Sequence, residues 1–123
     1  MFYSEKLPKS PAAAATAREL VERVREELSD SALEDARLLV SELVANAVEH
    51  AQADGEIEVN VALEDSSLRV EVIDSGPGFE YVPRAEDSGN ERGWGLHFID
   101  RLAKRWAIER GERTRVWFEI DTA

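Results

Sequence analysis

The fold is decided by residues 57–73, which read IEVNVALEDSSLRVEVI. Apolar residues stand at 57, 59, 61 and 63, and again at 68, 70 and 72, with a polar break between the two runs. Such alternation is typical of strands with one buried and one solvated face, and the break Asp65-Ser66-Ser67 is typical of a turn. The stretch therefore predicts an antiparallel hairpin with one face that needs a covering layer.

Helical patterns around this hairpin supply that layer. Apolar residues recur at spacings of three and four, and Ser10-Pro11 and the capping box at 31–34 indicate where two helices begin. The alanines at 12–15 are interpreted as a first helical turn, because alanine is the best helix former. The expected elements are a strand over 2–7, helices from Ser10 through Leu28 and from Ser31 to about Ala51, the hairpin, a helix beginning near Gly95, and two closing strands around 106–108 and 116–120, joined by a turn at Gly111.

This order of elements predicts an α+β fold. We expect a two-layer α/β sandwich, in which helices cover one face of a mixed, mostly antiparallel sheet. A doubly wound parallel sheet is disfavoured, because strands and helices do not take turns along the chain. The 123 residues suit one domain that spans 1–123.

Charge and composition exclude several classes of function. The net charge of −11, from 26 acidic and 15 basic residues, argues against partners that are nucleic acids or anionic membranes. The lack of cysteine rules out disulfides and thiolate metal sites, and two histidines argue against a histidine-rich metal centre. No signal peptide or membrane-spanning stretch is visible, so we expect a cytoplasmic protein.

Three short segments carry residues that could form a binding site. Glu42 and Asn46 are four residues apart, which places them on one face of the second predicted helix. Asp74-Ser75-Gly76-Pro77-Gly78 directly follows a strand, and Gly93-Trp94-Gly95-Leu96 opens a helix whose free N–H groups favour phosphate. Each segment also has an ordinary explanation. The Glu42–Asn46 pair is also explained as a solvated polar stripe, the segment from Asp74 to Gly78 as a simple turn, and the segment from Gly93 to Leu96 as a flexible hinge.

In their order and spacing, these segments together resemble the three nucleotide-binding boxes of the histidine-kinase-like ATPase superfamily, the Bergerat fold. The resemblance covers nearly the whole chain. Within the superfamily, the runs SELVANAVEHA at 41–51 and GLHFIDRLAKRW at 95–106 are most similar to the stand-alone anti-sigma-factor serine/threonine kinases.

The resemblance implies an ATP and Mg²⁺ site with distinct roles for its residues. Glu42 would be the catalytic general base, Asn46 the Mg²⁺ ligand, and Asp74 the acceptor of a hydrogen bond from the adenine amine. Thr114 would lie near the adenine, although an ordinary strand threonine explains it equally well, and Arg92 is also explained as an exposed rim arginine. The implied nucleotide-binding residues are Asn46, Asp74, Gly76, Gly78, Arg92, Gly93, Gly95, Leu96 and Thr114.

The function implied by the resemblance is that of a kinase which phosphorylates a serine or threonine of an antagonist protein and sequesters a sigma factor, working as a homodimer. The alternative is a non-catalytic module that senses ATP or ADP and switches its affinity for a partner. A detached catalytic domain of a sensor histidine kinase is less favoured. His50 and His97 both lie inside predicted helices of the domain, so neither suits the role of phospho-acceptor.

Overall fold

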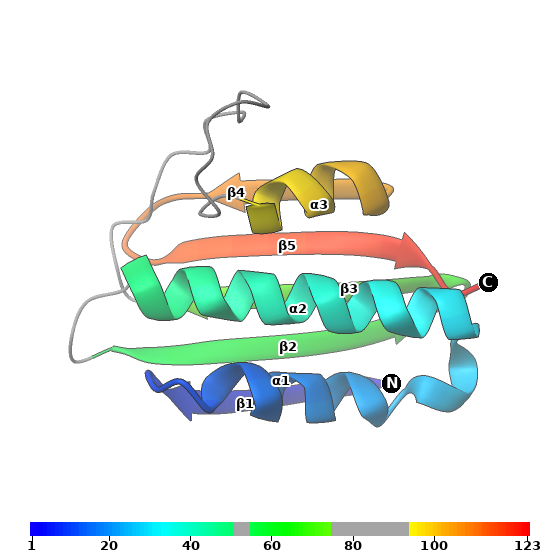
Figure 1. Ribbon diagram of the computed structural model, residues 1–123, viewed down its shortest axis with the longest axis horizontal. Helices are drawn as coiled ribbons and strands as arrows, with labels where there is room; N and C mark the ends of the chain where they lie inside the picture. Colours follow the sequence, from blue (N-terminus) through cyan, green and yellow to red (C-terminus); the bar gives the residue numbers. More distant parts are fainter. Residues whose placement is uncertain (51–54, 75–93) are drawn as a thin grey trace.

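Helices cover one face of a sheet in the computed structural model, which describes residues 1–50, 55–74 and 94–123 (Figure 1). This arrangement confirms the predicted α+β two-layer class. The described strands are β1 (Phe2–Pro8), β2 (Glu56–Glu64), β3 (Ser67–Asp74), β4 (Arg105–Glu109) and β5 (Thr114–Asp121). The described helices are α1 (Ala13–Glu22), a 3₁₀ turn (Arg25–Glu27), α2 (Asp30–His50) and α3 (Trp94–Leu102).

The order of the strands in the sheet is β1-β2-β3-β5-β4, and every described pair is antiparallel. The β2–β3 hairpin is the one that the alternating pattern predicts, with its turn at Asp65 and Ser66. The last strand, β5, lies between β3 and β4, so the closing hairpin joins the sheet through its second strand. This order leaves β1 and β4 as the two edges of the described sheet.

The core lies between the sheet and the helices. Alternate residues of β2 and β3 face the helices and are buried, while the residues between them face away. Phe118 of β5 is fully buried opposite Val70 of β3. The largest fully buried side chains are Phe118, Leu20, Leu39, Ile57, Leu68 and Ile99.

Both N-terminal helices begin at residues that differ from the sequence prediction. The first starts at Ala13 without a side-chain cap, and Ser10 contributes only its carbonyl, which accepts the Ala13 N–H at 3.0 Å. It ends at Glu22, short of the expected Leu28. The second starts at Asp30, because the cap is Ser29, whose Oγ accepts the Ala32 N–H at 3.0 Å.

A tertiary contact explains the position of this second cap. The backbone N–H of Ser29 donates to the carbonyl oxygen of Thr122, just past β5, at 2.8 Å. This bond ties the start of α2 to the C-terminal end of β5. A capping box at 31–34 would place the first turn two residues later and would break this link, so the tertiary contact overrides the local signal.

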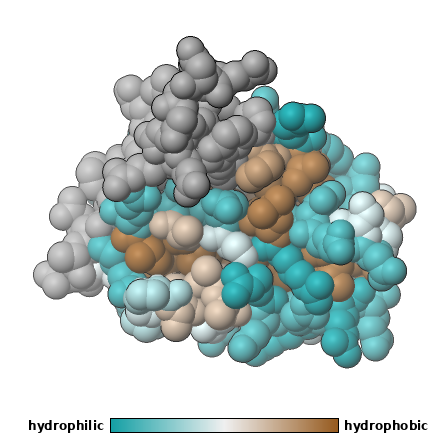
Figure 2. Space-filling model, viewed as in Figure 1, coloured by the Kyte–Doolittle hydropathy of each residue, from teal (hydrophilic) through white to brown (hydrophobic). Residues whose placement is uncertain are grey.

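The outer surface of the helix layer is mostly hydrophilic, with apolar colour confined to patches (Figure 2). Leu38 of α2 and Leu102 at the end of α3 are the large apolar side chains exposed on the described helices, each to 37%. None of the described helices combines the length and the apolar character that crossing a bilayer requires.

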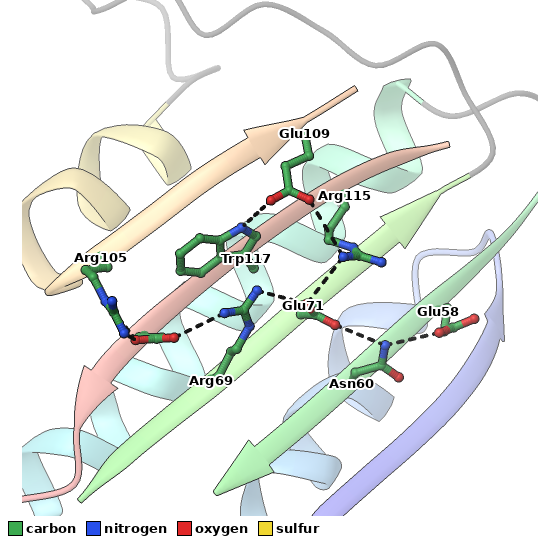
Figure 3. Close-up of polar contacts among 9 residues, drawn as sticks. Glu58, Asn60, Arg69, Glu71, Arg105, Glu109, Arg115 and Trp117 are labelled. Atoms are coloured by element: carbon green, nitrogen blue, oxygen red, sulfur yellow. Dashed lines mark hydrogen bonds and ion pairs between the residues drawn. The ribbon is translucent and has the colours of Figure 1, made fainter. Parts of the chain in front are cut away.

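The face of the sheet away from the helices carries a network of charged side chains (Figure 3). Its centre is Glu119, which is buried and accepts hydrogen bonds from Arg69 at 3.2 Å and from Arg105 Nε at 3.0 Å. The guanidinium of Arg69 also stacks on the Trp117 ring, 4.0 Å from its centroid. The network pairs the charged side chains that strand alternation places on the solvated face of the sheet.

The environment of Glu119 should make the free energy of unfolding depend on pH. Burial acts to raise the pKa of Glu119, but hydrogen bonds and charges from Arg105 and Arg69 outweigh it and hold the pKa below its usual value. A lowered folded-state pKa contributes stability above the unfolded-state value of about 4.3, and this stability is lost as pH falls through the folded-state pKa. We expect Glu119→Gln to lower the free energy of unfolding by about 1–3 kcal/mol at pH 7.

Urea unfolding at pH 7, 5 and 4 measures this effect. The difference between Glu119→Gln and the parent chain should shrink toward the acid end. Glu64→Gln, which removes the same charge from an exposed end of β2, serves as the matched control and should change the stability by less than about 0.5 kcal/mol. Equal effects of the two substitutions would show that the arginine network does not stabilise the carboxylate.

Candidate functional site

The predicted site residues that the structure describes lie on elements that meet at one end of the molecule. The C-terminal half of α2, the end of β3 and the start of β5 all lie at the left in Figure 1. The start of α3 points toward the same end. Helix α2 packs against β3, β5 and α3, so it lies at the centre of this arrangement.

Glu42 and Asn46 lie on one face of α2, as their spacing predicts. Both side chains are half-buried, whereas Leu43, Val44 and Ala47 of the same helix are buried in the core. The burial of these apolar neighbours fixes the rotation of α2 about its axis. This rotation leaves Glu42 and Asn46 beside the core but not within it.

Asn46 carries an unusual buried polar atom. Its side-chain Nδ2 is inaccessible to solvent and has no hydrogen-bond partner among the described residues. A buried polar group without a partner costs about 1–3 kcal/mol. Such a group in a folded protein needs an explanation, and a missing ligand is one of them.

Asp74 and Thr114 lie side by side where β3 ends and β5 begins. The β3–β5 register makes their Cα atoms direct partners. Asp74 is 3% exposed and Thr114 is fully buried. They alternate with Ile73 and Arg115, and they share a face of the sheet with the core residues Val72 and Val116. The pair therefore places polar atoms at the helix-covered side of the sheet.

A hydrogen-bonded clasp joins α1 to α2 immediately before Glu42. Arg18 Nη1 donates to the Ser41 hydroxyl at 2.9 Å, and that hydroxyl donates to the Arg37 carbonyl at 2.7 Å. The Arg37 guanidinium in turn pairs with Glu22 near the end of α1. This clasp could not be predicted from the sequence, because its members are widely separated along the chain and each is typical of an exposed helix face.

The remaining predicted residues are described only in part. Gly76, Gly78, Arg92 and Gly93 lie outside the described residues. Gly95 and Leu96 lie in the first turn of α3, which begins at Trp94 and so confirms the helix expected near Gly95. The first turn of a helix presents N–H groups without intrahelical partners, a suitable environment for an anion.

The residues that the structure describes contain no group of three acidic or histidine side chains that could enclose a metal ion. Mg²⁺ does not need such a cage, because it commonly keeps water and phosphate oxygens and takes few protein ligands. An amide oxygen is a hard ligand of the kind that Mg²⁺ prefers. Asn46 carries one such oxygen, Oδ1, whereas its unpartnered Nδ2 is a hydrogen-bond donor and takes no part in binding a cation.

Residues 7–120 match the family model described as the histidine kinase-like ATPase domain. The serine-protein kinase RsbW of Listeria monocytogenes serovar 1/2a is 38% identical over 64 residues, which cover 50% of this chain and 41% of that protein. RsbW of Bacillus pumilus is 34% identical over 77 residues, covering 58% and 46%. This chain spans about half the length of these relatives or less.

Solved structures show the same fold. The structure of the RsbU and RsbW domains of Rv1364c from Mycobacterium tuberculosis superposes with a TM-score of 0.75 at 27% identity, covering 98% of this chain and 32% of that chain. The catalytic domain of histidine kinase ThkA superposes with a TM-score of 0.60 at 18% identity, covering 98% of each chain. The second likeness is one of fold alone.

The unpartnered Nδ2 of the Asn46 amide gives a prediction about the ligand-free protein. Asn46→Leu replaces it with an apolar side chain of similar size, so the penalty of the buried polar atom disappears. We expect the free energy of unfolding to rise by about 1–2 kcal/mol, more than the roughly 0.7 kcal/mol that helix propensity alone can supply. Thermal and urea unfolding without nucleotide measure this.

Asn60→Leu is the matched control. Asn60 also has a buried atom without a partner, Oδ1, but its Nδ2 donates to Glu58 at 3.1 Å and to Glu71 at 3.4 Å. Because this substitution removes real hydrogen bonds, it should destabilise the protein. A loss of stability in Asn46→Leu as large as that in Asn60→Leu would contradict the prediction.

Proposed function

Because the chain belongs to the histidine kinase-like ATPase domain family, we propose that residues 1–123 form one ATP-binding domain of the anti-sigma-factor serine/threonine kinase type. The observation that carries the proposal is the arrangement at one end of the core. A buried Asp74–Thr114 pair lies where β3 ends and β5 begins, and Asn46, whose buried Nδ2 has no partner among the described residues, lies on the helix that packs against both strands. The likeness to proteins named RsbW supports the kinase type.

Asp74 would recognise the base of the nucleotide. A buried carboxylate is an acceptor-only group, so it suits the exocyclic amine of adenine. Guanine presents a carbonyl oxygen at that position, and a carbonyl would face the carboxylate without a donor. Thr114, as the direct neighbour of Asp74 across the strand pair, would provide a hydroxyl at the same place. Gly76 and Gly78 would let the nucleotide approach the backbone.

Asn46 and Glu42 would act at the phosphate end. Asn46 would hold Mg²⁺, which when bound neutralises phosphate charge. The N–H groups at Gly95 and Leu96 in the first turn of α3, together with Gly93 and Arg92, would bind the phosphates. Glu42, four residues before Asn46 on the same helix face, would accept the proton of the attacking hydroxyl.

The reaction would transfer the γ-phosphoryl group from ATP to a serine or threonine hydroxyl of an antagonist protein. The proton of that hydroxyl would pass to Glu42, the hydroxyl oxygen would form a bond to the γ-phosphorus, and the bond from that phosphorus to the bridging oxygen would break and release ADP. Positioning and charge neutralisation are the main requirements of such a transfer. The second partner would be a sigma factor, and the net charge of −11 suits a basic surface on it. The chain would act in the cytoplasm as a homodimer that regulates transcription.

The second candidate function is a switch without catalysis, in which ATP or ADP sets the affinity for a partner. It requires only the proposed binding residues Asn46, Asp74 and Thr114, which lie on α2 and at the β3–β5 pair, and it gives Glu42 no role in chemistry. Transfer of radiolabelled phosphate from ATP to a candidate antagonist protein separates the two functions. Nucleotide-dependent partner binding without transfer would favour the switch.

The first functional prediction concerns the base. We expect ATP and ADP to bind in the presence of Mg²⁺, and GTP to bind at least about tenfold more weakly, because guanine offers Asp74 no donor and so loses a hydrogen bond to a charged group, which contributes about 1.5–3 kcal/mol. Asp74→Asn should weaken both adenine nucleotides. Isothermal calorimetry measures the affinities, with Asp65→Asn in the exposed β2–β3 turn as the matched control. Equal affinities for ATP and GTP would refute the role of Asp74.

The second functional prediction separates binding from chemistry on α2. Asn46→Ala should weaken Mg²⁺–nucleotide binding, whereas Glu42→Gln should leave that affinity nearly unchanged. In a transfer assay Glu42→Gln should slow phosphorylation by about 10²- to 10⁴-fold, the usual effect of losing a general base. Glu49→Gln, on an exposed position of the same helix, is the control. Normal transfer by Glu42→Gln would exclude Glu42 as the base.

A further inference from the structure

A pocket opens on the face of the sheet away from the helices. It has a volume of about 280 Å³ and lies at the turn between β4 and β5. Its described lining residues are Ile73, Glu109, Arg110, Gly111, Arg113 and Arg115. Three of these side chains are arginines, in a protein whose net charge is −11. This local concentration of guanidinium groups is opposite to the overall charge of the chain.

Two of these arginines are only loosely paired. Arg113 lies 3.8 Å from Glu58, and Arg115 lies 4.0 Å from Glu71 and 3.7 Å from Glu109, distances too long for hydrogen bonds. The side chains of Arg113 and Arg115 are 50% and 44% exposed. In the same network, by contrast, Arg69 and Arg105 make hydrogen bonds to Glu119 at 3.2 and 3.0 Å (Figure 3). The guanidinium groups at the pocket therefore keep donors available for a further acceptor.

We propose that this pocket binds an acidic side chain of a protein partner. The carboxylate would accept hydrogen bonds from Arg113 and Arg115, a pairing for which the planar guanidinium is well shaped. Ile73, which is 6% exposed and lines the pocket, would contact the methylene groups of the same side chain. Gly111 is exposed at the turn and adds no side chain to the mouth of the pocket.

A carboxylate fits the pocket better than a free phosphate does. Glu109 lies in the lining and would repel a dianion more strongly than a single negative charge. The net charge of −11 also lowers the concentration of small free anions near the surface. An acidic residue on a protein avoids this penalty, because other contacts of that partner contribute to its binding.

The pocket and the proposed adenine site lie on opposite faces of the sheet, at neighbouring residue pairs. Ile73 pairs with Arg115, and the next pair along the ladder is Asp74 with Thr114. Because successive residues of a strand point to opposite faces, one pair contributes to the pocket and the other to the helix-covered side. A partner held at the pocket would leave the nucleotide site accessible. The proposal goes beyond the nucleotide function and does not require it.

Nuclear magnetic resonance of the full ¹⁵N-labelled chain tests the proposal. The probe is a capped peptide, acetyl-Gly-Glu-Glu-Gly-amide, and its counterpart has glutamine in place of both glutamates. Trp117 is a built-in reporter, because its indole Nε1 donates to Glu109 at 3.2 Å and Glu109 also pairs with Arg115. We expect saturable shifts of the Trp117 indole and Arg115 Nε signals with the glutamate peptide, and at least tenfold weaker binding of the glutamine peptide.

The double variant Arg113→Gln/Arg115→Gln should bind the glutamate peptide at least tenfold more weakly. The control Arg25→Gln/Arg101→Gln removes the same charge from exposed positions elsewhere and should bind as the parent chain does. An equal loss in the control would show general charge attraction and would overturn the proposal. Tighter binding of inorganic phosphate than of the glutamate peptide would also overturn it.

ADP affinity, measured in parallel on every variant, keeps this proposal distinct from the nucleotide function. The double variant should keep the parent affinity for ADP to within about twofold, because Arg113 and Arg115 lie outside the proposed nucleotide site. Peptide binding without ADP binding supports the pocket and refutes the nucleotide function. ADP binding without a saturable peptide response refutes the pocket alone.

Discussion

The architecture depends on the antiparallel pairing of β3 with β5, two strands that are not consecutive in the chain. The ladder runs from Ser67 opposite Asp121 to Asp74 opposite Thr114. Because β5 lies next to β3, β4 is left at the edge of the described sheet. Helix α3 comes directly before that edge strand in the chain. Phe118, buried opposite Val70, anchors the ladder in the core. A loss of this pairing would separate the ends of β3 and β5 that form the candidate site.

The same ladder gives the two faces of the sheet different chemistry. Residues on one face pack under the helices, while those on the other form the network around Glu119 and Trp117. Strand periodicity makes this division strict, since a slip by one residue would exchange the two faces. The proposed adenine contact and the arginine pocket are adjacent pairs of one ladder. The register of the β3–β5 pairing therefore fixes the positions of both.

Much of the architecture could be predicted from local patterns, and the rest depended on long-range contacts. Alternation over 57–73 predicted the hairpin and its buried face, and the four-residue spacing placed Glu42 and Asn46 together. The start of α2 was predicted wrongly, because the bond from Ser29 to Thr122 joins residues far apart in sequence. Periodicity likewise does not specify that β5 pairs with β3. The arginine pocket was missed, since arginines near a turn are typical of a solvated surface.

The distribution of buried polar groups indicates that the α2 end of the core was not shaped by stability alone. Glu119 and Asn60 are buried on the outer face, where both make hydrogen bonds to charged neighbours. Asp74 and Thr114 are buried on the core side, where apolar residues at both positions would bury more hydrophobic surface. Asn46, on the helix packed against β3 and β5, adds a buried Nδ2 that has no acceptor among the described residues. Polar groups at one end of an otherwise apolar core are the arrangement expected of a site that a ligand completes.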